Sequence, residues 1–484
     1  MAEVQHEVGE VTHRAARNAA VRAISEIAGK VATLAWTIAA ARILPTEEFG
    51  TVSYALTVML VLSALASWGF DSGLTRNGAA DPGALPGLHR ATQAWKTAVA
   101  APVFLVAGIV MAGSPSVGSW VVLGCMLLAG FPEQWSATIR STAAARQVSG
   151  GISVALVLQR LATAVAVLVA LVVDPSAVSV AVGFLVGTFA GYLAHVVALR
   201  RLGVDAPMRS LSRRDMAGAM HGTFVLGLSG LVLMLLMRVD VLILGALEGA
   251  EAVAVYSVAY RVLETVLFVT YAINYAVLPV MSADASQETR RVGFERALAV
   301  AAFAYLPFVV VCVVEGRAVL ELLFGATYAE DGSTVLAVLS PAPLFIAVAT
   351  FAGSALLAVR RSRELLLAAA VALGGNLVLN LVLIPPHGVV GAAVATTVSY
   401  AVQAAILVVA MVLRGERPAL LTPLAWAAIA AVLLLGALWA SPFPLLLEIA
   451  VGGVVYLGVW LALVRKAAPE QYAVVVRLAA RARA

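Results

Sequence analysis

A small set of ionisable residues interrupts otherwise apolar stretches of this chain. They are the cations Lys30, Arg160, Arg238 and Arg261 and the acids Glu26, Glu133, Asp240, Glu264 and Glu448. Arginine binds phosphate and carboxylate groups well because its planar guanidinium presents N–H donors as a fork. Cations held in apolar surroundings therefore predict a site that receives an anionic group.

Spacing separates the residues that can pair locally from the rest. Glu26 and Lys30 are four positions apart, and Arg261 and Glu264 are three apart. Each pair can meet on one face of a helix. One interpretation of both pairs is self-neutralisation that locks helix packing. The other makes Lys30 and Arg261 substrate contacts, with Glu26 and Glu264 as ion-coupling or structural partners.

Arg238 and Asp240 are two positions apart and point to different sides of a helix, so each needs its own partner. For Arg160 and Arg238 the alternatives are an interhelical salt bridge or carbonyl clamp, and a cationic cavity that binds substrate. Asp240 is a candidate for binding a coupling cation or proton, with a structural arginine partner as the alternative.

Three further charges have structural interpretations. Lys96 is close to the end of its apolar stretch, so its long side chain is expected to reach the membrane surface. Glu133 and Glu448 lie nearer segment ends or in peripheral segments, which favours structural roles.

The elements that position these charges are membrane-spanning helices. Hydrophobic residues make up 62% of the chain and charged residues 12%. Soluble domains average about 45–50% apolar and about 25% charged residues. Apolar stretches of about 18 residues or more recur along the whole sequence, which is typical of transmembrane helices. The composition predicts an all-α polytopic membrane protein with about fourteen transmembrane helices.

Loop charges predict the orientation. Arginine and lysine gather in every second loop, for example at residues 200–214 and 360–363, whereas the intervening loops carry mainly acids such as Glu47, Glu48 and Asp174. Because basic loops stay on the cytoplasmic side, both termini are expected in the cytoplasm and the protein in the cell membrane.

Two pairs of similar segments suggest an internal repeat. Residues 48–56 resemble 252–260, and residues 141–146 resemble 355–360. Six helices per repeat is an even number, so the two lobes should insert in the same orientation. The predicted parts are a cytoplasmic N-terminal segment 1–20, an N-lobe 21–203, a cytoplasmic linker 204–216, a C-lobe 217–413, two extra helices in 414–464 and a basic cytoplasmic tail 465–484.

Other classes of function have little support. The sequence has no phosphate-binding loop, no nucleophile elbow and no metal-ligand spacing, and Cys125 and Cys312 lie singly in apolar stretches. We therefore expect a secondary-type transporter rather than an enzyme, with no cofactor, no metal and no nucleic-acid partner. A proton or sodium gradient is the candidate driving force.

Motifs along nearly the whole chain carry a family resemblance. They are residues 41–50, 68–76, 238–240, 256–259, 323–328 and 388–396. These motifs occur in the family's order, and with them the chain resembles the Wzx-type polysaccharide flippases of the multidrug/oligosaccharidyl-lipid/polysaccharide (MOP) exporter superfamily. The arginine constellation of the lipid II flippase branch cannot be mapped onto the chain, which disfavours that substrate.

The resemblance implies two six-helix lobes around a central cavity. It also implies outward movement of undecaprenyl-(pyro)phosphate-linked oligosaccharide by alternating access, in polysaccharide biosynthesis. The implied partners are the bilayer, this lipid-linked substrate and, as candidates, a polysaccharide polymerase and glycosyltransferases. The alternatives are a cation-coupled multidrug antiporter of the same superfamily and a non-transporting membrane scaffold for glycosyltransferases. An antiporter cavity for organic cations should be acidic, which disfavours that alternative.

Overall fold

The structure is a computed structural model of the 484-residue chain. It describes residues 25, 28–112, 119–148, 150–201, 203, 212–278, 281, 285–439 and 444–467. The predicted N-terminal segment 1–20 and Glu26 lie outside the described residues, as do residues 204–211 of the linker and 468–484 of the tail. The described part is helical and contains no strand, which confirms the predicted all-α fold.

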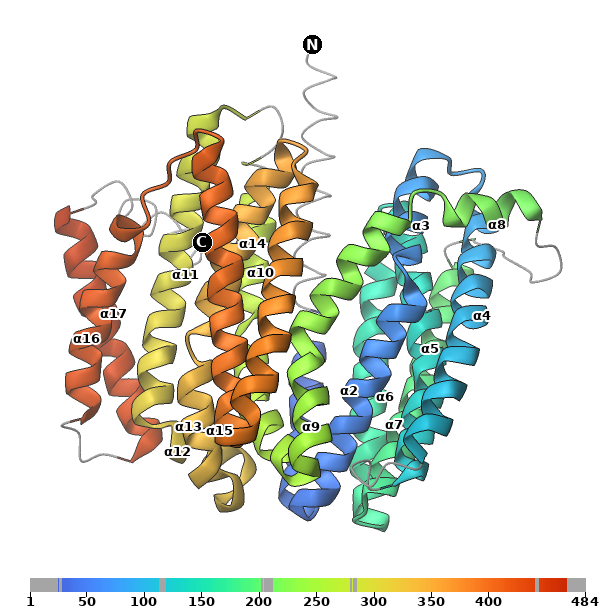
Figure 1. Cartoon of the computed structure of the whole chain (residues 1–484), viewed down its shortest axis with the longest axis horizontal. Coiled ribbons are helices and arrows are strands. Elements are labelled where there is room, and N and C mark those ends of the chain that lie inside the picture. The colour runs from blue at the N-terminus through green and yellow to red at the C-terminus, as the bar shows by residue number, and fades with distance from the viewer. Residues whose placement is uncertain are drawn as a thin grey trace. The chain divides into compact units, whose positions relative to one another are not determined.

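Helices follow one another with short connections (Figure 1). Residues 28–43 are helical. They are followed by α2 (Thr46–Ser67), α3 (Phe70–Ala80), α4 (Leu85–Ala112), α5 (Trp120–Ala145), α6 (Gly150–Val173), α7 (Ala177–Arg201) and α8 (Arg213–Met220). Next come α9 (Phe224–Val266), α10 (Phe268–Val277), α11 (Gln287–Val314), α12 (Gly316–Phe324) and the short 3-10 turn η2 (Ala326–Tyr328). The last are α13 (Ala329–Leu339), α14 (Ala342–Ala358), α15 (Ser362–Leu413), α16 (Leu421–Trp439) and α17 (Leu445–Ala467).

Ten helical stretches among the described residues are long and apolar enough to cross a membrane. Two of them run for more than 50 residues, Phe224–Val277 and Ser362–Leu413. About 20 residues suffice to span the hydrocarbon core, so both are long enough for two crossings. The chain is a multi-pass membrane protein, and the count of fourteen helices stays a prediction.

Each of the two long stretches reverses direction at a glycine. Gly249 has φ 85° and ψ −170°, so α9 is interrupted there. A Cβ on Gly245 would lie 3.1 Å from Cγ2 of Val253. A straight helix would separate these residues by about 12 Å. Within α15, Gly388 (φ 52°) makes a similar reversal.

A second kind of break separates α2 from α3. Trp68 and Gly69 both have left-handed backbones, with φ 35° and 70°. The turn packs directly against the start of α9, because a Cβ on Gly69 would lie only 2.4 Å from the backbone N of Gly227. Only glycine fits such a backbone-to-backbone contact. The break redirects the chain and places Asp71 in the first turn of α3.

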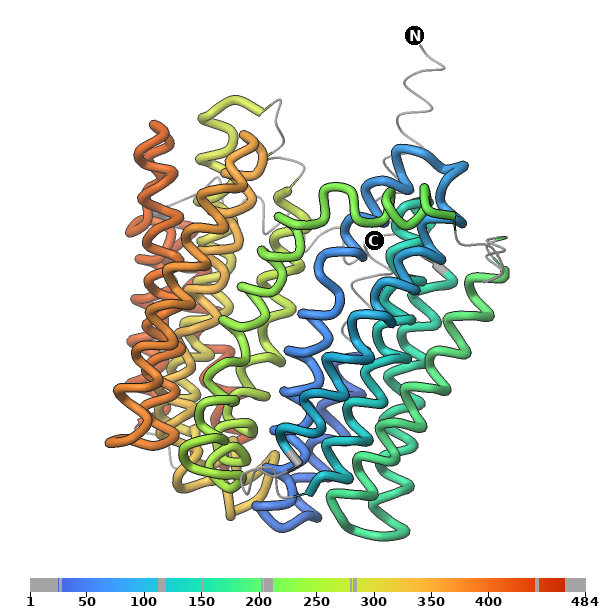
Figure 2. The backbone as a smooth tube through the Cα atoms, turned by 45° about the vertical axis from the view of Figure 1, so that its right-hand side comes forward, coloured from blue at the N-terminus to red at the C-terminus, as the bar shows by residue number. Residues whose placement is uncertain are grey.

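The helices α6 and α7 form a close-packed hairpin, visible as two adjacent helices in Figures 1 and 2. Gly183, Gly187 and Gly191 recur at every fourth position of α7. Added Cβ atoms would approach Val167, Thr163 and Gln159 of α6 to within 2.8, 2.3 and 2.2 Å, respectively. Small residues at this spacing allow membrane helices to pack backbone against backbone.

The chain divides into two compact units. The first contains residues 1–257 and 377–392, and the second contains residues 258–376 and 393–484. The second unit has a core that includes Phe294, Tyr305 and Phe351. Tyr305 is also tied to α10 by a 2.6 Å hydrogen bond between its hydroxyl and that of Thr270. The division into the lobes 21–203 and 217–413 stays a prediction.

Candidate functional site

Arg160 lies where α6 meets α5 and the first described helix. A Cβ on Gly29 would lie 3.1 Å from Cγ of Arg160, so the arginine stem packs against that helix beside Lys30. The guanidinium donates from Nη2 to Oε1 of Glu133 on α5, at 3.2 Å. The interhelical salt bridge considered for Arg160 is therefore present. It leaves 31% of the arginine side chain exposed.

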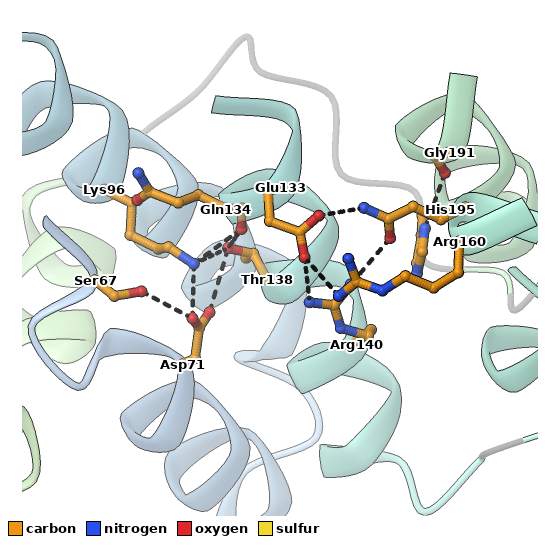
Figure 3. Close-up of polar contacts among 11 residues, drawn as sticks. Ser67, Asp71, Lys96, Glu133, Gln134, Thr138, Arg140, Arg160, Gly191 and His195 are labelled. Carbon is orange, nitrogen blue, oxygen red and sulfur yellow. Dashed lines mark hydrogen bonds and ion pairs between the residues drawn. The ribbon is translucent and has the colours of Figure 1, made fainter. Parts of the chain in front are cut away.

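Glu133 is the centre of a larger group (Figure 3). Its Oε1 also faces Nη2 of Arg140 at 3.6 Å, and its Oε2 accepts a hydrogen bond from the amide of Gln159. Arg140 donates in turn to the amide oxygen of Gln159 at 3.3 Å. We call Glu133, Arg140, Gln159, Arg160 and His195 the arginine cluster. Within it, two guanidinium groups share one carboxylate.

His195 on α7 completes the arginine cluster. It follows Gly191 by one further interval of four residues, so it lies on the glycine face that packs against α6. The side chain is fully buried, and its Nδ1 lies 2.9 Å from the carbonyl oxygen of Gly191. Its Nε2 is buried without a hydrogen-bond partner among the described residues. Figure 3 shows the contact of the ring with the Gly191 carbonyl as a dashed line.

A second buried charge group, the lysine cluster, lies one helix away. It consists of Ser67, Asp71, Lys96, Thr138 and the carbonyl of Gln134. Lys96 is 1% exposed, and its ammonium donates to Asp71 Oδ2 at 2.7 Å, to the Gln134 carbonyl at 2.9 Å and to Thr138 Oγ1 at 3.2 Å. Ser67 and Thr138 also donate to Asp71.

The lysine cluster corrects the expectation that Lys96 reaches the membrane surface. The ammonium points into the bundle because the turn at Trp68 and Gly69 brings Asp71 to it. A paired and fully hydrogen-bonded ammonium costs far less to bury than an isolated one.

The remaining predicted residues lie in other places. Arg261 pairs with Glu264 at 2.9 Å, as their spacing predicted, and both side chains are about one-fifth exposed. Asp240 is fully buried and accepts hydrogen bonds from the hydroxyl of Tyr256 and from the backbone N–H of Val241. Arg238 is half-buried in the same helix. Whether these groups contact substrate or ions stays a prediction.

The family of the chain follows from its sequence. The sequence profile of the family described as "polysaccharide biosynthesis protein" matches residues 15–283, which is more than half of the chain. The chain belongs to this family. The family predicted from the ordered motifs is thereby confirmed.

One curated relative supports the same assignment over a shorter length. The chain is 31% identical over 166 residues to the probable flippase AglR of Haloferax volcanii. That alignment covers 33% of this chain and 34% of the relative, so the chain matches about a third of the relative's length.

Solved structures show the fold of this family member. A lipid II flippase, MurJ, in an inward closed conformation is similar with a TM-score of 0.77 at 12% identity, over 92% of this chain and 99% of that one. An inward-facing multidrug resistance transporter of the MATE family, described as a member of the MOP superfamily, has a TM-score of 0.63 at 14% identity. It covers 82% of this chain and 98% of that one. The fold is that of MOP superfamily transporters.

Sequence reasoning missed three members of the arginine cluster in this family member. Arg140, Gln159 and His195 are not among the candidate residues that the sequence singles out. Two signals in the sequence could have found them. Glu133 and Arg140 are seven positions apart, which places them on one helix face, and His195 continues the four-residue spacing of the α7 glycines.

Proposed function

We propose that the protein is a flippase that moves undecaprenyl-(pyro)phosphate-linked oligosaccharide from the inner to the outer leaflet. Family membership and the MOP transporter fold support a transporter of this kind. The observation that carries the substrate class is the pair of arginines, Arg140 and Arg160, that face the one carboxylate of Glu133 among apolar helices. A phosphate-linked lipid needs such groups for its headgroup, while its tail stays in the bilayer.

The substrate contacts in this proposal are Lys30, Arg160, Arg238 and Arg261. Glu26, Asp240 and Glu264 serve as ion-coupling groups or as structural partners of the cations. Alternating access, driven by a proton or sodium gradient, exposes the contacts first to the cytoplasmic and then to the outer side. Both termini are cytoplasmic, the protein lies in the cell membrane, and a polymerase and glycosyltransferases are the candidate partners.

Variants of Arg238 and Arg261 test the proposal in a strain that lacks the native gene. Arg238→Ala and Arg261→Ala should abolish surface polysaccharide and cause lipid-linked oligosaccharide to accumulate on the inner leaflet, although both variants still insert. Arg317→Ala is the matched control, because Arg317 is an exposed arginine on α12. Normal surface polysaccharide in both test variants would refute the assigned contacts.

The fold likeness to a multidrug transporter keeps one alternative in view. A cation-coupled multidrug antiporter should bind organic cations, which the arginines at the proposed contacts would repel. Overexpression in a drug-sensitive strain separates the two functions. Raised resistance to several cationic drugs would favour the antiporter. Full surface polysaccharide with all four cations neutralised would instead favour a membrane scaffold.

A further inference from the structure

The members of the arginine cluster include two guanidinium groups and one carboxylate. Oε1 of Glu133 faces both Arg140 and Arg160, and its Oε2 is occupied by Gln159. The single carboxylate is therefore shared among three side chains. The two guanidinium side chains remain 27% and 31% exposed. Part of each arginine side chain is therefore not covered by other protein atoms.

The imidazole of His195 is the second observation. Its Nδ1 faces the carbonyl oxygen of Gly191 and so carries a proton, because a carbonyl can only accept. In the neutral ring Nε2 then carries a lone pair and can only accept a hydrogen bond. It is buried, and no donor for it is found among the described residues. Buried polar atoms are nearly always hydrogen-bonded, so an exception marks a place where a proton or ligand arrives.

The groups around His195 decide when that proton can arrive. Helix α5 contributes Glu133 and Arg140, α6 contributes Arg160, and the first described helix carries Lys30 beside the Arg160 stem. On α7 itself Arg200 and Arg201 follow within two turns. A positive imidazole among these cations is repelled. A bound dianion would favour the protonated imidazole instead, since it attracts the imidazolium and accepts its Nε2–H.

The position of the arginine cluster along its helices suits a loading site. Arg140 is about 8 Å from the end of α5, His195 about 9 Å from the end of α7 and Arg160 about 15 Å from the start of α6. These three helix ends lie together, because α5 leads into α6 by a short turn and α7 returns beside α6. The predicted topology makes this the cytoplasmic side.

We infer that the arginine cluster is an anion site that takes up a proton on His195 Nε2 as an oxyanion dianion binds Arg140 and Arg160. The inference rests on the proposed function in one respect, that Arg160 meets the phosphate of the substrate. It adds that His195 is a positioning residue and that anion loading is linked to protons. By linkage, binding strengthens as the pH falls, at most about tenfold per pH unit for one proton.

Sulfate is the probe for the test, because its charge stays at −2 between pH 5.5 and pH 8, unlike that of phosphate. The full-length protein in lipid nanodiscs is titrated with sulfate by isothermal calorimetry in two buffers of different ionisation enthalpy. The expected result is uptake of up to one proton per sulfate and weaker binding at high pH. Absence of sulfate binding, or binding without proton uptake, would overturn the inference.

His195→Asn sharpens the test, since the Asn amide can still donate to the Gly191 carbonyl but has no titratable nitrogen. It should bind sulfate with no proton uptake and no pH dependence, and unchanged proton uptake would contradict the role of His195. If this variant does not fold, Arg160→Gln replaces it and should weaken sulfate binding at least tenfold. Arg317→Ala is the matched control, because Arg317 is exposed on α12 and lies outside the arginine cluster, and this variant should keep the proton uptake of the wild type.

Transport is measured separately, as flipping of fluorescent lipid-linked oligosaccharide in proteoliposomes. Wild-type protein that binds sulfate with proton uptake but does not flip this lipid would refute the proposed function and leave the anion site intact. Protein that flips the lipid but binds sulfate without proton uptake would refute the proton-linked anion site and leave the proposed function intact.

Discussion

The two buried charge clusters of the first unit differ in balance. In the lysine cluster one ammonium meets one carboxylate, and the ammonium has three acceptors. Asp71 receives donors from three side chains. In the arginine cluster two guanidinium groups share one carboxylate, and one imidazole nitrogen has no partner among the described residues. Both clusters use α5, so the same helix holds a balanced and an unbalanced group.

This difference suits the lysine cluster to a structural role and the arginine cluster to ligand binding. A balanced, fully hydrogen-bonded cluster gains nothing from a ligand, and removal of one member leaves a charge exposed to an apolar environment. An unbalanced and partly open cluster can lose a cation at little cost and is stabilised by an added anion. The following changes test that distinction, in order of decreasing effect on stability.

Lys96→Met should have the largest effect. It leaves Asp71 without its ion pair and removes one donor from the Gln134 carbonyl and from Thr138 Oγ1. This should cost about 3 kcal/mol, at the low end for breaking a buried pair because Asp71 is one-quarter exposed. Thermal unfolding in detergent, followed by tryptophan fluorescence, measures the loss. The double variant Lys96→Met/Asp71→Asn should recover at least half of it. A single variant as stable as wild type would refute a structural role.

Glu133→Gln should have an intermediate effect. The amide keeps the shape and one acceptor but removes the shared negative charge, so the two arginines repel each other, at a cost of about 1–2 kcal/mol. Sulfate affinity should rise, because the competing carboxylate is gone. Calorimetry and thermal unfolding of the same preparation measure both changes. Weaker sulfate binding in this variant would contradict the anion site.

Arg160→Gln should change stability by less than about 1 kcal/mol, because Glu133 keeps Arg140 and Gln159 and the arginine of the lost ion pair is 31% exposed. Flipping in proteoliposomes should nevertheless fall at least tenfold. Arg146→Gln is the matched control, because Arg146 is exposed just after α5 and lies outside both clusters. A large loss of stability without a specific loss of transport would make Arg160 a structural residue.

Ser67→Ala should have the smallest effect. It removes one of three donors to Asp71, and Lys96 and Thr138 remain in place. The expected loss is about 0.5–1 kcal/mol, as for a single neutral donor to a partly exposed carboxylate. Thermal unfolding measures it, and flipping should stay at the wild-type level. A loss comparable to that of Lys96→Met would mean that Ser67 has a larger role in the turn.

Local features of the fold and site were predictable from the sequence, and contacts between distant helices were not. Apolar stretches and ordered motifs gave the all-α membrane fold and the family, and the spacing of Arg261 and Glu264 gave their ion pair. The partners of Arg160 and Lys96 depend on which helices become neighbours and on the turn at Trp68 and Gly69. Spacing along one segment carries no information on either.

The arrangement of the arginine cluster along the chain has a consequence for biogenesis. Glu133 and Arg140 lie on one face of α5, so this helix can enter the bilayer with its acid already compensated by its own arginine. Helix α6 then brings Arg160, and α7 closes over it along the glycine face. The three helices leave the ribosome one after another. The site can therefore assemble co-translationally, before most of the second unit has been synthesised.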